Sequence, residues 1–157
     1  MQISDIMIQY ITASKDDIEL LMQSRLEMLK VVNDLPEDYV YDDAFVENSR
    51  AYFYNPNQTT ILAMDEDKVI GCATMCYIEI MPTFSHPTGK RAHLMNVYTN
   101  SQYRRQGIAR QMLDMLIAEA REKGVTEISL DSTESGRPLY KKCGFVESDE
   151  CMVLNLN

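Results

Sequence analysis

The chain has few of the residues that staple small secreted domains or hold metal ions. Its 157 residues include four cysteines, two histidines and no tryptophan. None of the cysteines belongs to a Cys-x-x-Cys pair, and they lie within apolar patterns: Cys72, Cys76, Cys143 and Cys151. With only His86 and His93 as further ligands, this spacing disfavours zinc and favours reduced thiols in the core. We therefore expect no metal site.

Long apolar runs and an excess of positive charge are also missing. No run approaches the length that crosses a bilayer, and residues 1–5 lack the basic and apolar regions of a secretory signal. The 15 basic and 24 acidic side chains give a net charge of −9, which disfavours nucleic acid and anionic membranes as partners. The length fits a single domain over residues 1–157, and we expect it to be cytoplasmic.

The most informative stretch of the sequence is 96–109, whose pattern predicts a strand, a short basic turn and the start of an amphipathic helix. A helix N-terminus leaves backbone N–H groups without partners and carries partial positive charge. Small residues at Gly107 and Ala109 let a ligand approach, and Arg104, Arg105 and Arg110 add cationic donors. The turn therefore predicts a phosphate site. Neither Gly-x-x-x-x-Gly-Lys-Ser/Thr nor Gly-x-Gly-x-x-Gly is present, which excludes two common phosphate loops.

Hydrophobic periodicity predicts helices and strands in mixed order. The predicted strands are 6–13, 59–64, 69–81, 92–98, 125–132 and 151–156. The predicted helices are 18–33, 42–54, 107–123 and 134–143. This order predicts an α/β fold in which a central mixed β-sheet is flanked by about four helices around one core.

Two motifs carry a resemblance to a known family. Arg104-x-x-Gly107-x-Ala109 matches the Arg/Gln-x-x-Gly-x-Gly/Ala signature of the GNAT superfamily of acetyl-coenzyme A-dependent N-acetyltransferases. Further on, the stretch 139–145 is similar to the family's aliphatic-Tyr-x-x-x-Gly-Phe element. The resemblance covers roughly residues 60–157. It departs from the usual pattern at Ser101, where many members have proline, and at Ala109, where many have glycine.

The resemblance implies a GNAT-like fold, with acetyl-coenzyme A (acetyl-CoA) as co-substrate and direct attack of an amine on its thioester. The pyrophosphate would bind backbone N–H groups of Arg104, Arg105, Gln106, Gly107, Ile108 and Ala109. The pantetheine arm would run beside Val97, Tyr98 and Thr99, with an N–H near Val97 stabilising the oxygen of the tetrahedral intermediate. Ser132 and Glu134 follow the next strand, where they either touch coenzyme A or cap the short helix.

The implied reaction needs a base and an acid. An alkyl amine with a pKa of about 10.4 is almost fully charged at neutral pH, so a base or a water relay must take its proton. The central strand carries no carboxylate. Two side chains are the main candidates for the base: Glu79 on the preceding strand, acting through water, and His93. His93 is a candidate because an unperturbed imidazole titrates near ~6.5. His86 is a further imidazole, but it lies in a loop. Tyr140 matches the family's tyrosine near the thioester sulfur, which implies a general acid; alternatively it anchors the short helix in the core.

The implied acceptor is a primary amine of a small molecule or peptide, held by the first two helices and the loop 82–91. An acidic stretch at 34–47 favours a cationic amine, and it also fits a solvated surface. Many relatives pair as homodimers. Two other functions remain open from the sequence: a non-catalytic acyl-CoA-binding sensor or regulatory module, and an unrelated α/β binding domain whose turn mimics the motif.

Overall fold

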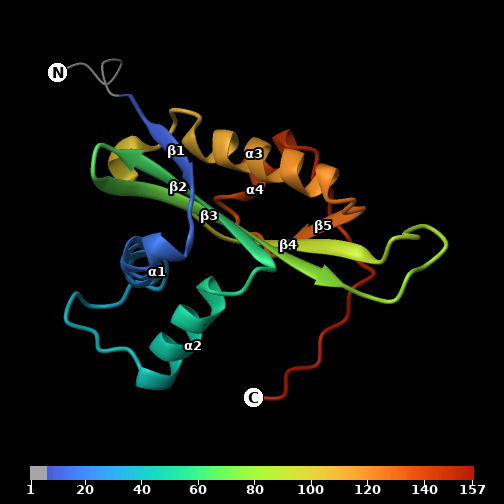
Figure 1. Ribbon diagram of the computed structural model, residues 1–157, viewed down its shortest axis with the longest axis horizontal. Coiled ribbons are helices and arrows are strands. Elements are labelled where there is room, and N and C mark those ends of the chain that lie inside the picture. The colour runs from blue at the N-terminus through green and yellow to red at the C-terminus, as the bar shows by residue number, and fades with distance from the viewer. Residues whose placement is uncertain (1–6) are drawn as a thin grey trace.

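A single mixed sheet organises the computed structural model, which describes residues 7–157 (Figure 1). Within that range the sheet has five strands, which lie side by side in chain order: β1 (Gln9–Thr12), β2 (Gln58–Asp65), β3 (Lys68–Glu79), β4 (Lys90–Thr99) and β5 (Glu127–Leu130). Strands β1 to β4 pair antiparallel, whereas β5 runs parallel to β4. The predicted mixed sheet is therefore confirmed.

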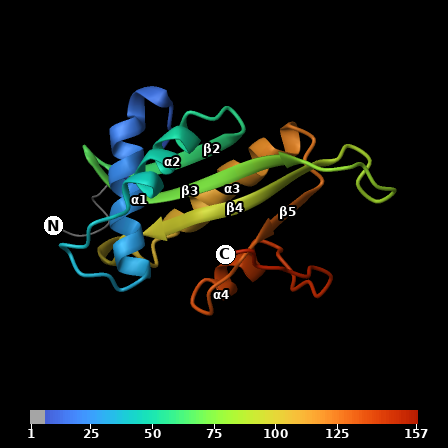
Figure 2. The same cartoon turned by 90° about the horizontal axis from the view of Figure 1, so that it is seen from below.

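Helices pack on both faces of this sheet (Figures 1 and 2). One face is covered near β1–β3 by α1 (Ile18–Val32) and α2 (Asp43–Phe53), and the other by α3 (Ile108–Glu122) and α4 (Arg137–Lys142). Two short 3₁₀ turns, Lys15–Asp17 and Ser101–Tyr103, precede α1 and α3. None of the helices between residues 7 and 157 is long and apolar enough to cross a membrane.

Side-chain caps mark the start of the 3₁₀ turn before α1 and the start of α2. The Ser14 hydroxyl accepts from the Asp16 N–H at 3.2 Å, and the Asp17 carboxylate accepts from the Ser14 N–H at 2.8 Å, which forms a capping box. The Asp42 carboxylate accepts from the Ala44 N–H at 2.9 Å at the start of α2. The Asp42 cap lies where the sequence predicts the start of the second helix, whereas the Ser14 cap precedes the turn that leads into α1.

The hydrophobic core has two parts, one on each face of the sheet. The larger cluster joins α3, through side chains such as Met112 and Leu116, to β2, β3 and β4. The smaller cluster joins Leu21 and Met22 of α1 to Leu62 and Cys72 of the sheet. Cys72 is fully buried and its pKa is raised to about 12, so this thiol is an inert core group.

The structure corrects several predicted boundaries. The predicted strand 151–156 does not form, because a strand needs a hydrogen-bonding neighbour and none lies beside this segment within residues 7–157. The short helix begins at Arg137 rather than residue 134, with Pro138 in its first turn. Strand β5 is shorter than 125–132, and β3 ends at Glu79 rather than 81. The first strand begins at Gln9, and residue 6 of its predicted range lies outside the described residues.

Candidate functional site

The turn between β4 and α3 has a backbone suited to anions. Arg105 and Gly107 both adopt left-handed conformations, with φ of 63° and 77°. Left-handed residues beside right-handed or extended ones turn consecutive N–H groups toward one side of the chain, as in anion-binding nests. Asn100 holds the start of this turn, because its side chain accepts from the Gln102 N–H at 3.0 Å. The turn is therefore a concave group of donors at the end of a strand.

The beginning of α3 is open to a ligand. Gly107 is the N-cap residue and no side chain caps the helix, so N–H groups of the first turn have no intrahelical acceptor. A Cβ placed on Gly107 would meet no atom within 4 Å, which shows free space in front of the turn. The Ile108 side chain is buried in the core, so this residue presents only its backbone to that space. These features fit a phosphate group.

Two of the arginines near the turn have structural contacts. Arg104 Nε donates to the Thr99 carbonyl at 3.1 Å, which holds the side chain against the end of β4. Arg110 Nε donates to Asp114 at 3.0 Å and its Nη1 donates to the Lys142 carbonyl at 3.4 Å, so it connects α3 to α4. Arg105 is exposed. The cationic surroundings predicted from the sequence are therefore present around the turn.

A bulge interrupts β4 just before the turn. Thr74 pairs with Met95 and Cys72 with Tyr98, so two residues of β4 lie opposite one of β3. Asn96 is left-handed at a φ of 60°, and its amide donates to Thr74 Oγ1 at 3.1 Å. Sequence reasoning missed this bulge, because nothing in the run 92–99 breaks a strand pattern.

Arg25 of α1 fixes the bulge from the helix side, since its Nη1 donates to Asn96 Oδ1 at 3.1 Å. The Cys72 thiol donates to the Asn96 carbonyl at 3.2 Å. Burial lowers the pKa of Arg25. The only signal of Arg25 in the sequence is a charged residue within the apolar pattern of helix 18–33.

Strands β4 and β5 separate beside this bulge. Their pairing ends at Leu94 and Leu130, so no described strand covers the β5 side of Val97, Tyr98 and Thr99. Thr99 Oγ1 is buried without a hydrogen-bond partner in the described part of the chain. The structure thus brings the three predicted strand residues to an opening that leads to the turn 104–109.

Tyr140 of α4 is half-buried and packs on the main core cluster. Its ring packs edge-on against Phe145, with centroids 6.0 Å apart, and a Cβ on Gly136 would lie 3.0 Å from its Cε2. Burial raises the pKa of the hydroxyl above its ordinary 10.0, so it is protonated at neutral pH. A protonated phenol held in one orientation can act as a proton donor.

His93 lies on β4 just before the strands separate. Its Nδ1 is 2.7 Å from Ser129 Oγ, and its Nε2 is 3.6 Å from Asp131 Oδ2. Residues of a strand alternate between the two faces of the sheet. Ala92 and Leu94 are buried on the face that α3 covers, so the His93 side chain lies on the other face, the one that α1 and α2 cover. An imidazole that bridges β4 and β5 at this point is placed to exchange a proton.

Glu79 of β3 lies away from the turn 104–109. It shares a face with Tyr77, whose hydroxyl donates to Glu119 of α3, and it borders a cavity with Glu122 and Lys123 at the C-terminal end of that helix. The turn 104–109 adjoins the N-terminal end of α3. The structure therefore does not bring Glu79 to the turn.

The remaining candidates have local roles. Thr133, not Ser132 or Glu134, holds the turn before α4, since its Oγ1 accepts from the Gly136 N–H at 3.2 Å. Ser132 is half-buried between β5 and α4, and Glu134 is exposed. His86 lies in the loop before β4, and its Nδ1 is 2.9 Å from Thr126 Oγ1, just before β5.

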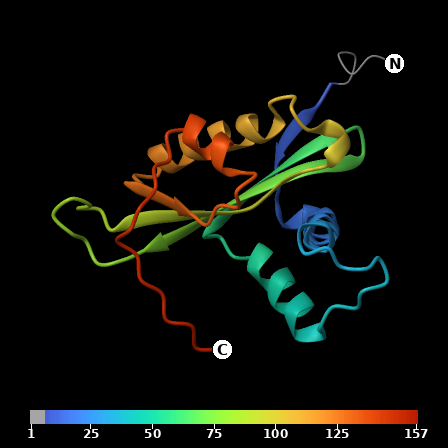
Figure 3. The same cartoon turned by 180° about the vertical axis from the view of Figure 1, so that it is seen from behind.

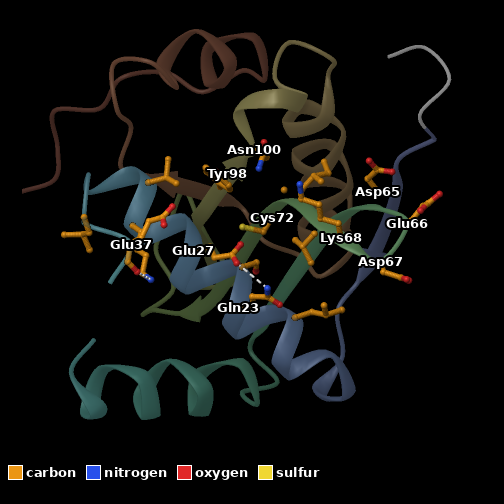
Figure 4. A pocket seen from close by; sticks show the side chains of 18 of the residues that line it. Gln23, Glu27, Glu37, Asp65, Glu66, Asp67, Lys68, Cys72, Tyr98 and Asn100 are labelled. Carbon is orange, nitrogen blue, oxygen red and sulfur yellow. Dashed lines mark hydrogen bonds between the residues drawn. The ribbon is translucent and has the colours of Figure 1, made fainter. Parts of the chain in front are cut away.

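A groove of about 1030 Å³ lies between α1 and the β2–β3 turn (Figure 4). It reaches Tyr98 and Asn100 at the end of β4, so it adjoins the residues that lead into the turn. Acidic side chains outnumber basic ones along it: Glu27, Asp34, Glu37, Asp65, Glu66 and Asp67 against Lys30 and Lys68. Only Asp34 and Glu37 come from the acidic stretch noted in the sequence. Within residues 7–157, no group of His, Cys, Asp and Glu could hold a metal ion.

Known proteins match this arrangement. A predicted acetyltransferase from Clostridium acetobutylicum, solved with acetyl-CoA, superposes with a TM-score of 0.83 at 32% identity over 96% of this chain and 97% of the other. A GCN5-related N-acetyltransferase from Ralstonia eutropha JMP134 shares the fold, with a TM-score of 0.76 at 21% identity over 96% and 100%.

Curated relatives match over a shorter region. Glucosamine 6-phosphate N-acetyltransferase from Trypanosoma brucei brucei is 29% identical over 57% of this chain, and N-acetyltransferase 8 from Homo sapiens is 28% identical over 65%. The matches span 58% and 44% of those proteins, about half their length. The model of the acetyltransferase (GNAT) family matches residues 25–145, which contain the bulge, the turn and Tyr140. The chain belongs to the GNAT family of acetyltransferases.

Proposed function

We propose that the protein transfers the acetyl group of acetyl-CoA to a primary amine of a small molecule or peptide. The observation that carries this proposal is the concave turn with left-handed Arg105 and Gly107, which opens where β4 and β5 separate. The bound acetyl-CoA of the Clostridium relative supports the choice of donor. When bound, acetyl-CoA supplies a thioester that an amine can attack directly.

The chain's own backbone performs the binding steps. N–H groups at 104–109 hold the diphosphate, with the N-terminal end of α3 adding favourable charge. The uncovered edge of β4 at Val97–Thr99 pairs with the amide-rich arm of the donor. An N–H beside the Asn96 bulge stabilises negative charge on the thioester oxygen, and such a donor is worth about 3–4 kcal/mol. The network of Arg25 and Asn96 positions this N–H.

Tyr140 and His93 supply the proton transfers in this proposal. The Tyr140 hydroxyl, which its raised pKa keeps protonated at neutral pH, protonates the departing thiolate. His93 takes the proton of the incoming amine, and the Asp131 carboxylate near its Nε2 stabilises the resulting imidazolium. Glu79 is left out, because it lies at the other end of α3.

We expect His93→Gln to lower kcat by about 10²-fold at neutral pH, because it removes a base that accepts the amine proton. The deficit should shrink at alkaline pH, because an amine with a pKa of about 10.4 then deprotonates in solution. Steady-state kinetics from neutral to alkaline pH measures this. His86→Gln is the matched control, since it removes a hydroxyl-bonded imidazole from a loop and should leave kcat unchanged. A pH-independent deficit in His93→Gln would assign the residue a structural role.

In this proposal the acceptor binds on the face of the sheet that α1 and α2 cover. The acidic groove beside Tyr98 supports a cationic amine, and a curated relative named for glucosamine 6-phosphate supports an amino sugar within the same class. We further propose that the protein forms a homodimer and works in the cytoplasm, where its four free thiols remain reduced.

Thermal denaturation with added ligands tests the donor. Acetyl-CoA should raise the melting temperature, since a ligand that binds only the folded state stabilises it, while NAD and ATP should have little effect. Release of free thiol in a panel of polyamines, amino sugars and lysine peptides then tests transfer. Stabilisation without thiol release from any amine would favour the alternative function, a non-catalytic acyl-CoA sensor. Equal effects of the three nucleotides would contradict the proposal.

A further inference from the structure

Two hydroxyl groups are buried in the apolar layer between the sheet and its first two helices. α1 and α2 lie on the same face of the sheet, opposite α3 (Figures 1 and 3). The layer is mainly apolar, yet Thr60 of β2 is only 1% exposed and Thr74 of β3 only 3%. Valine has the same shape and carries no hydroxyl that needs a partner. Packing alone therefore does not account for these two residues.

The two hydroxyls connect the sheet to the end of α2. Thr60 and Thr74 are paired across β2 and β3, and their Oγ1 atoms are 2.8 Å apart. Thr60 Oγ1 donates to Gln58 Oε1 at 2.8 Å. Gln58 Nε2 in turn donates to the Phe53 carbonyl at 3.0 Å, in the last turn of α2.

In the other direction the hydroxyls connect to the bulge of β4. Thr74 Oγ1 accepts from Asn96 Nδ2 at 3.1 Å, and Asn96 Oδ1 accepts from Arg25 Nη1 at 3.1 Å. The contact between Arg25 and Asn96 is thus one end of a longer chain. Five consecutive hydrogen bonds lead from α1 through the bulge and across two strands to α2.

Every donor in this chain points the same way. A guanidinium has no acceptor, so Asn96 must present Oδ1 to Arg25 and Nδ2 to Thr74. At the other end a backbone carbonyl only accepts, so Gln58 presents Nε2 to it and Oε1 to Thr60. The single hydrogen of the Thr60 hydroxyl is then in use, and Thr74 must donate to Thr60. No member can reverse its direction without leaving a neighbour unpaired.

We propose that Thr60, Thr74 and Gln58 are positioning residues, which hold the bulge of β4 in the shape that the acetyl transfer needs. Asn96 in the bulge is left-handed, a conformation that a side chain adopts only where its surroundings fix it. The chain begins at a cation and ends at the C-terminal carbonyls of a helix, which carry partial negative charge, so both ends favour the same direction of donation. The inference rests on the proposed function, in which an N–H beside this bulge donates to the thioester oxygen.

NMR of the protein without any ligand tests the chain itself. Thr60→Val removes the central hydroxyl without removing a partner of Asn96, and it should shift the resonances of the Asn96 side-chain amide and of the Val97 N–H. Thr60→Ser keeps the hydroxyl and should leave both close to their original positions. Thr59→Val is the matched control, because this neighbouring buried threonine bonds instead to Glu119 of α3, at 3.2 Å. Unchanged Asn96 resonances in Thr60→Val would overturn the inference.

The infrared stretch of the thioester carbonyl tests the positioning, with acetyl-CoA labelled with carbon-13 at this carbonyl. Binding to the unaltered protein should lower the stretching frequency, since a hydrogen bond polarises the C=O group. Thr60→Val and Gln58→Met should each lose part of this shift and lower kcat by about two- to tenfold, the effect of one hydrogen bond, with the Kd of acetyl-CoA unchanged. Thr59→Val should keep the full shift and the full kcat.

The outcomes separate this inference from the proposed function. A carbonyl shift that both variants retain in full would overturn the positioning role and leave the proposed transfer intact. No shift even in the unaltered protein would contradict the proposed place of the thioester, and the positioning role with it. Gln58 is half-buried at the end of the chain, so Gln58→Met decides both measurements even if Thr60→Val does not fold.

Discussion

Gly107→Ala should weaken acetyl-CoA binding by about ten- to hundredfold, the loss of one charge-assisted hydrogen bond worth roughly 1.5–3 kcal/mol. Gly107 has a φ of 77°, where a side chain costs about 1–2 kcal/mol, so the turn relaxes and its N–H groups rotate away from the diphosphate. The added methyl also projects into the free space in front of the turn. Calorimetric titration with acetyl-CoA measures the change.

Gly124→Ala provides a matched control on the same helix. Gly124 follows the other end of α3 with a φ of 79°, and a Cβ there would lie 3.7 Å from the nearest atom, an ordinary contact. Both variants therefore lose similar stability without ligand, but only Gly107→Ala should lose the stabilisation by acetyl-CoA. Arg104→Ala combined with Gly107→Val should abolish it. Unchanged binding in Gly107→Ala would remove the turn from the donor site.

Periodicity predicted most of the architecture because most elements are amphipathic and locally capped. The run of α3 and the hairpin of β2 and β3 follow from patterns within single segments, and the turn motif predicts where the proposed donor site lies. The glycine at 107 was informative since its left-handed conformation and lack of a side chain are both needed there.

Features that depend on distant partners could not be predicted. The bulge at Asn96 is held by Arg25 and Thr74, which lie far away in the sequence. Alternation along β3 puts Glu79 on the face opposite its even-numbered neighbours, but the sequence alone does not say which helix each face meets. In the structure Tyr77, on the same face as Glu79, contacts α3. The segment 151–156 has the pattern of a strand, yet whether it pairs depends on a neighbour.

The proposed site combines features that local sequence encodes with features that depend on distant partners. The turn that we propose as the donor site is encoded locally, whereas the proposed proton transfers depend on side chains from two further segments, His93 on β4 and Tyr140 on α4. The β4–β5 pairing ends at Leu94 and Leu130, and in the proposed function the donor binds between the two strands beyond this point. Variants of the turn should therefore change donor affinity, while variants of the two side chains should change turnover.

Tyr140→Phe should lower kcat by about 10²-fold while leaving acetyl-CoA affinity unchanged, because it removes the acid for the departing thiolate but keeps the ring against Phe145. Burial raises the pKa of Tyr140 above 10.0, so the wild-type acid is protonated through neutral pH and is lost only as pH rises through that higher value. The deficit of the variant should therefore stay constant from neutral to mildly alkaline pH, unlike that of His93→Gln. Tyr10→Phe is the control, since Tyr10 packs on the same core cluster with a pKa also raised by burial. Full turnover in Tyr140→Phe would leave this residue as an anchor of α4 and require another proton donor.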